Sequence, residues 1–448
     1  MSQSTARAPV WRMRIADWWA NAWRWVLFAT GAALSGYFLL EQGVSNGIFT
    51  AGAIAALVIG ASITQSKPMA IALMAMPALF IVERVALGGL GLSVSDVALA
   101  AAFGTAVLLG TRPYSRALRQ LLWLNFFYQF TTLFTVIVNP YAANTVEWFH
   151  AWLLVSGAMV VGWALGRGGY ARIALLLIVG TACVIAVGTL ITGILQYASG
   201  DFGPVYPLVP LPIHKNLAGT AMAFAAVVAY ANPDWMAWRK NWASAAFWLL
   251  ILAILMTQSR QAIVGLIFAI VLIASRRGAS GRSRLVLLLV IPGIWLVTVM
   301  VIEQVESQNQ YNSVFQRLQW FREVYALWKL SPVFGHGLRY WYTDTTAAFQ
   351  PPQAELEVLA SAGLVGLVGF VAMWIGIIFV LWHVDPRFGT LALAVTLSRL
   401  VQGQFDLFWV AAQVSIPFVI AGICLGAKVW DESQARSARV QRMHVERR

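Results

Sequence analysis

Long apolar runs recur along almost the whole chain, from residue 24 to residue 428, and they restrict the fold more than any other feature. A run of about 20 apolar residues can cross a bilayer as a helix, whereas soluble domains use shorter, amphipathic elements. Of the 448 residues, 60% are hydrophobic and only 11% are charged. The sequence therefore predicts an all-α polytopic membrane protein in which residues 1–448 form a single integral membrane domain.

Hydropathy yields about fourteen candidate transmembrane helices, and because several are short we expect about 12–14 spans. The candidate spans lie near residues 24–40, 47–64, 69–83, 94–110, 120–138, 148–166, 172–197, 216–231, 242–257, 261–275, 285–303, 356–382, 388–401 and 409–427.

Basic residues orient these spans, because Lys and Arg concentrate in cytoplasmic loops. With the N-terminus inside, alternate loops carry the positive charge, and the basic tail at 429–448 is also cytoplasmic. The net charge of +13 thus belongs to membrane topology, and we expect no nucleic-acid partner. The residues concerned are Lys67, Arg112, Arg116, Arg119, Arg167, Arg172, Arg239, Lys240, Arg276, Arg277, Arg282 and Arg284.

The opposite, extracytoplasmic face receives a loop at 199–215, the break "TQSRQ" at 257–261 and one long loop at 304–354. No glycine-rich nucleotide loop occurs on the inner side, and no His, Cys, Asp and Glu cluster has metal-ligand spacing. We therefore expect neither a metal nor another cofactor.

The long outer loop contains the segment "SVFQRLQWFREVYALWKLSP" at 313–332. Ser313 and Gln316 form a potential capping box, and Pro332 marks a stop, so the segment predicts an amphipathic helix. Its apolar stripe would lie on the membrane or on the helix bundle, with Arg317 at the edge of that stripe. A simple interfacial helix with snorkelling cations is the alternative. The stripe comprises Val314, Leu318, Phe321, Tyr325 and Trp328.

Arg260 stands in the short break between two apolar runs, with no acidic residue beside it. An arginine stays charged and is costly near hydrocarbon, so an anionic ligand is one reason for its position. The flanking runs of about 15–16 residues span only ~22–24 Å, less than a ~30 Å hydrocarbon core, which places the turn in a recess. An ordinary interfacial arginine is the alternative interpretation.

Three motifs in order, "TQSRQAIVGL", "RLQWFREVYALWKLSPVFGHG" and "QAELEVLASAGLVGLVGF", resemble the membrane family of O-antigen ligases and O-antigen polymerases. The upstream segments "LSVSDVALA" and "HKNLAGTAMAF" are also similar to that family. The resemblance implies a glycosyltransferase in the bacterial cytoplasmic membrane with its active site outside. Its partners would be a polyprenyl-(pyro)phosphate-linked glycan donor, a glycan or glycolipid acceptor, and the bilayer.

The resemblance also assigns roles to individual residues. Arg260 would bind the pyrophosphate and Arg317 would supply a second cation, because the planar guanidinium binds phosphate oxygens in pairs. His214 and Lys215, at the outer end of a helix, would hold a second phosphate or the acceptor sugar. Helix-end snorkelling explains Lys215 equally well.

One position departs from the family, which places a histidine-asparagine pair where this chain has Pro352-Gln353. That histidine is the family's expected base for the acceptor hydroxyl. His336 in the preceding glycine turn and Glu355, three residues past Pro352, are the candidates to replace it. A transporter or flippase and a non-catalytic glycan-lipid binding protein remain as alternatives, the first of which would show inverted repeats with broken helices.

Overall fold

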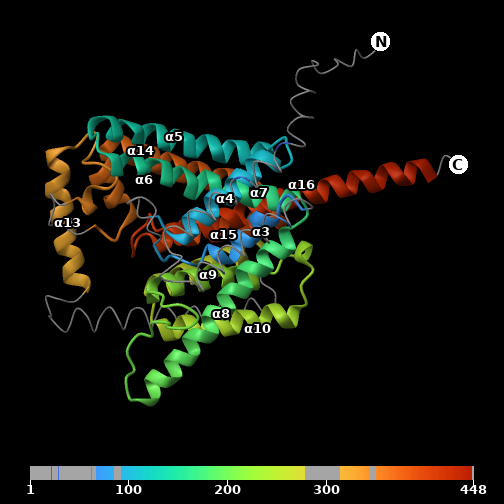
Figure 1. Cartoon of the computed structure of the whole chain (residues 1–448), viewed down its shortest axis with the longest axis horizontal. Helices are drawn as coiled ribbons and strands as arrows, with labels where there is room; N and C mark the ends of the chain where they lie inside the picture. The colour runs from blue at the N-terminus through green and yellow to red at the C-terminus, as the bar shows by residue number, and fades with distance from the viewer. Residues whose placement is uncertain are drawn as a thin grey trace, which may run out of the picture.

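The computed structural model describes residues 67–84, 92–277, 313–343 and 350–445, with three isolated residues nearer the N-terminus. This part of the chain is a bundle of helices without a β-strand, which confirms the expected all-α class (Figure 1). The elements are α3 (Ala70–Ala78), α4 (Val94–Leu109), α5 (Arg116–Val138), α6 (Ala142–Trp152), η1 (Leu153–Gly157), α7 (Ala158–Arg167), α8 (Ala171–Ala198), α9 (Lys215–Ala231), η2 (Asp234–Met236), α10 (Lys240–Thr257), α11 (Arg260–Arg277), α13 (Ser313–Leu330), η3 (Tyr340–Tyr342), α14 (Ala354–Trp382), α15 (Pro386–Gln402) and α16 (Ala411–Val445).

Within the described ranges, 6 helices are long and apolar enough to cross a membrane, and α4 is a shorter apolar helix. The polytopic membrane class is therefore confirmed. The spans expected near 24–40, 47–64 and 285–303 lie outside the described residues. The six candidates are Arg116–Val138, Ala142–Arg167, Ala171–Ala198, Lys240–Thr257, Ala354–Trp382 and Ala411–Arg439.

Two expected spans differ in length from the helices found. The span expected at 69–83 contains only α3, whose 9 residues cannot cross a bilayer as one helix. At the other end of the chain, α16 runs on from the expected span at 409–427 and continues as helix to Val445. The basic tail thus begins as a continuation of the last helix rather than as a separate segment.

Helix α14 is interrupted at Gly363, whose φ of 66° and ψ of −165° are not helical. The interruption frees backbone groups that a membrane cannot hydrate. The loop after α13 pairs with them. The N–H groups of Leu364 and Val365 donate to the carbonyls of Pro332 and Val333 at 2.9 and 3.2 Å.

Two further bonds complete this pairing from the other side of the break. The N–H groups of His336 and Gly337 donate to the carbonyls of Ala360 and Ser361 at 3.1 and 2.8 Å. The glycine-rich loop after α13 therefore supplies hydrogen-bond partners for the interrupted backbone of α14.

The expected outer helix is present as α13, and Figure 1 places it at one end of the bundle, opposite the end from which α16 projects. Val324 is buried on this helix, whereas Phe321 and Tyr325 are exposed. Helix α13 therefore packs on the bundle with the face that carries Val324, and not with the face that carries Phe321 and Tyr325.

Candidate active site

The break "TQSRQ" is a tight turn between α10 and α11. Helix α10 ends at Thr257, Gln258 adopts a left-handed conformation with φ 50°, and Arg260 is the first residue of α11. This local geometry puts the half-buried Arg260 side chain at the helix N-terminus, where backbone N–H groups also favour an anion.

Helix α9 brings two further candidates to this turn. Gly219 allows the close approach, because a Cβ there would lie 2.6 Å from the Cβ of Ser259. The ammonium of Lys215 and the guanidinium of Arg260 are close enough to repel each other. Two neighbouring cations attract an anion, whose negative charge would offset their mutual repulsion.

His214 caps α9, and its Nδ1 accepts the N–H of Asn216 at 3.3 Å. Burial lowers the pKa of the His214 imidazole; the Asp406 carboxylate opposes this effect and the Lys215 ammonium adds to it. A ring with a lowered pKa is neutral at pH 7 and still carries an N–H on Nε2. His214 therefore offers a hydrogen-bond donor rather than a third positive charge.

The loop between α15 and α16 lies against the cation cluster formed by Lys215 and Arg260, with His214 beside it. Asp406 accepts a bond from Gln261 Nε2 at 3.1 Å, which joins the loop to the first turn of α11. Arg399, fully buried, donates to the carbonyls of Leu407 and Phe408. Hydrogen bonds from Gln261 and from Arg399 thus hold the loop in place.

The two residues proposed from the sequence as bases have hydrogen-bonded positions. Both oxygens of Glu355 accept amide bonds, from Gln404 at 2.9 Å and from Gln353 at 2.6 Å. His336 Nε2 bonds the carbonyl of Leu327 at 2.8 Å, so this nitrogen carries the proton and ties the glycine turn to α13. Arg317 lies in α13, but its side chain is outside the described residues.

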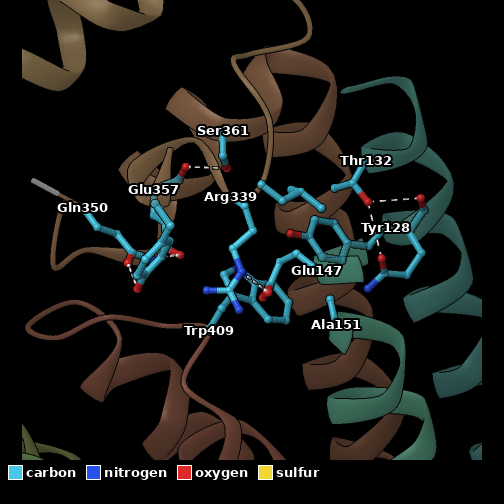
Figure 2. Close-up of a pocket in the computed structure, with 12 residues that line it drawn as sticks. Tyr128, Thr132, Glu147, Ala151, Arg339, Gln350, Glu357, Ser361 and Trp409 are labelled. Atoms are coloured by element: carbon cyan, nitrogen blue, oxygen red, sulfur yellow. Dashed lines mark hydrogen bonds and ion pairs between the residues drawn. The ribbon is translucent and has the colours of Figure 1, made fainter. Parts of the chain in front are cut away.

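A small cavity with polar walls lies beside the start of α14 (Figure 2). Its volume of ≈ 30 Å³ holds one or two water-sized groups. Glu357, Glu147 and Arg339 contribute the charges, from α14, α6 and the loop after α13. Arg339 Nε and Glu147 Oε2 form an ion pair at 2.7 Å.

Behind this ion pair a chain of buried charges runs into the bundle. Glu147 Oε1 and Asp96 Oδ1 face the two ring nitrogens of His150 at 3.3 and 2.9 Å. Because carboxylates only accept, both nitrogens must donate, and the ring is a cation. Asp96 in turn accepts from the N–H and hydroxyl of Ser93 at 2.9 and 2.7 Å.

The sequence analysis missed this network of Asp96, Glu147, His150 and Arg339. One local signal was available, since Glu147 and His150 are three residues apart and share a helix face. The pairing of Asp96 with His150 and of Glu147 with Arg339 depends on tertiary contacts, which a single sequence does not display.

Replacing Glu147 by glutamine should destabilise the fold, because two cations lose their shared buried partner. We expect a loss on the order of 3 kcal/mol. Denaturant unfolding in detergent micelles would measure it. The matched control is Asp431→Asn, whose ion pair with Arg387 is exposed and long at 3.7 Å and should be worth at most about 1 kcal/mol. Equal losses in both variants would contradict a special role for the buried network.

Residues 245–371, which run from α10 into α14, match the family model described as O-antigen ligase. This part of the chain is similar to the O-antigen ligase family. The resemblance expected from the motifs is thereby confirmed. No curated protein matches the chain.

The matched residues 245–371 contain only part of the candidate site. Arg260, His336, Glu355 and Glu357 lie within it, whereas the α9 cation Lys215 precedes it. Helix α6 and the loop between α15 and α16 also lie outside the matched residues. The candidate site is therefore formed where the matched residues pack against other helices of the chain.

Proposed function

We propose that this protein transfers or polymerises a glycan from a polyprenyl-(pyro)phosphate carrier onto an acceptor hydroxyl at the outer face of the cytoplasmic membrane. The family match supports glycan transfer of the O-antigen ligase or polymerase type in general. The carrier and the acceptor are inferred from the chemistry of the site, and the side of the membrane from the distribution of basic residues.

The observation that carries the proposal is the half-buried Arg260 at the N-terminus of α11, beside Lys215 at the start of α9. A departing pyrophosphate gains negative charge in the transition state, and fixed cations stabilise that charge most where water is excluded. Arg260 suits the role because its planar fork binds two phosphate oxygens and keeps its proton.

The side of the membrane follows from the distribution of basic residues. The end of the bundle from which α16 projects carries Lys428, Arg436 and Arg439 on that helix, as expected for a cytoplasmic end. The cation cluster and α13 would then face the periplasm or cell exterior, where a carrier-linked glycan is presented.

Proteoliposomes distinguish this proposal from a flippase. A carrier-linked glycan and an acceptor supplied on the same side should give a new glycosidic product without movement of the carrier between leaflets. Movement of the donor between leaflets with no product would favour the transporter instead. Stable donor binding with neither outcome would favour a non-catalytic binding protein.

The basic residues of α13 provide a separate prediction. If Arg317 is the second phosphate cation, Arg317→Ala should lower turnover more than Arg322→Ala or Lys329→Ala. Both control side chains are exposed, and Lys329 Nζ lies over the Tyr325 ring at 4.3 Å. Steady-state rates at saturating donor would measure the difference. Equal losses in the three variants would indicate a diffuse basic surface rather than one positioned residue.

A further inference from the structure

The cavity beside α14 contains the carboxylate of Glu357, which has no role in the phosphate site around Arg260. Glu357 is buried, with 4% of its surface exposed, and it lines the cavity. Its Oε1 accepts from Gln350 Nε2 at 2.7 Å and its Oε2 accepts from the N–H of Phe408 at 3.2 Å. Each oxygen has two lone pairs, so each retains one for a further donor.

The other walls of the cavity have the composition of a sugar-binding site. Trp409 and Tyr128 stack with ring centroids 5.7 Å apart, and the Arg339 guanidinium lies 4.8 Å from the centre of the Tyr342 ring. Aromatic rings, a carboxylate and a guanidinium together match the apolar faces and the hydroxyl groups of a glycan. The volume of ≈ 30 Å³ admits a hydroxyl group rather than a whole sugar ring.

One loop connects the cavity with the first turn of α11. The loop between α15 and α16 contacts both: Asp406 is bonded to Gln261 beside Arg260, and Phe408 is bonded to Glu357. Two residues of chain span at most about 7 Å. One short loop therefore links the Glu357 carboxylate to the first turn of α11, which begins at Arg260.

We propose that Glu357 is the general base that accepts the proton of the acceptor hydroxyl. This proposal rests on the proposed function. The hydroxyl oxygen attacks the anomeric carbon of the donor while its proton passes to a Glu357 oxygen. The bond from that carbon to the phosphate oxygen breaks, and the pyrophosphate leaves with the electron pair beside Arg260. Glu357 then releases the proton to solvent or to the leaving group.

Glu357 fits this role better than Glu355 because of where the two side chains lie. They occupy the same first turn of α14, but Glu355 is bonded to the amides of Gln353 and Gln404 and does not line the cavity. Glu357 faces the cavity together with Arg339. In this proposal Glu357 of α14 takes the role of the base that the family assigns to a histidine at the position of Pro352.

The decisive comparison is Glu357→Gln against Glu355→Gln, which make the same change of charge in one helical turn. We expect Glu357→Gln to lower kcat by about 10²–10⁴-fold, the usual contribution of a general base. The Kd for the carrier-linked donor should not change. Glu355→Gln and His336→Gln should each lower kcat much less than Glu357→Gln, because neither side chain lines the cavity. Full turnover by a folded Glu357→Gln protein would overturn the proposal.

A measurement on the wild-type protein covers the case in which Glu357→Gln does not fold. An apolar carbodiimide should modify Glu357, and the acceptor glycan should protect it, as read by mass spectrometry of the peptide. Modification that the acceptor does not slow would also overturn the proposal. If wild-type protein forms no product with any acceptor, the proposed function fails instead, so the two failures are distinguishable.

Discussion

Arg260→Ala is expected to lower kcat for glycan transfer by about 10²–10³-fold, equivalent to about 2–4 kcal/mol of transition-state stabilisation. The reason is that the leaving pyrophosphate loses a cation that binds two of its oxygens at once. Folding and membrane insertion should be unaffected, because Arg260 is half-buried at a helix start rather than part of the core. Initial rates with a defined carrier-linked donor would measure the change.

Arg260→Lys should be nearly as inactive, since an ammonium keeps the charge but cannot bind phosphate as a planar fork. Arg276→Ala is the matched control on the same helix. Arg276 lies at the far end of α11, where it donates to the carbonyl of Trp382 at 2.7 Å, and its loss should leave transfer unchanged. Near-wild-type transfer by Arg260→Ala would remove the basis for the phosphate site.

Gly363→Ala is expected to destabilise the folded protein by on the order of 3–5 kcal/mol. Its φ and ψ belong to a region that essentially only glycine adopts, at a cost of about 1–3 kcal/mol for other residues. An added Cβ would also meet the backbone of Val333 and Phe334. Displacing that loop would break several of the hydrogen bonds that satisfy the interrupted helix, each worth about 1 kcal/mol.

Thermal unfolding and the yield of folded protein in detergent would measure this effect. Gly180→Ala is the control, because Gly180 lies within the helix α8 and its Cβ would meet nothing within 4 Å. Alanine there should be neutral or slightly stabilising. If Gly363→Ala were as stable as Gly180→Ala, the interruption of α14 would not require glycine.

Hydropathy and motif order were sufficient for the class of fold and for the family. The apolar runs at 172–197 and 356–382 correspond closely to α8 and α14, since burial in lipid demands long helices irrespective of tertiary detail. The span expected at 69–83 was wrong in length. The segment is apolar along its whole length, and hydropathy measures only that composition. The helix nevertheless ends at Ala78, one residue after Pro77, because backbone geometry sets where a helix stops.

The candidate site was only partly predictable. Arg260 stood out because a lone cation in an apolar stretch is costly. Glu355 and Glu357 could not be distinguished, because which of two carboxylates faces a cavity depends on how α14 packs against the α15–α16 loop. Arg339 and Glu147 are 192 residues apart in the numbering, so their pairing follows only from the fold.

The most direct test of the proposed function is the stoichiometry of transfer by the purified protein. A synthetic polyprenyl-pyrophosphate glycan is incubated with candidate acceptors in detergent or proteoliposomes, and both products are quantified. We expect one new glycosidic bond for each carrier pyrophosphate released, without added nucleotide, and no product from the Arg260→Ala protein. Donor binding without release of carrier pyrophosphate across a broad acceptor panel would contradict the proposed function.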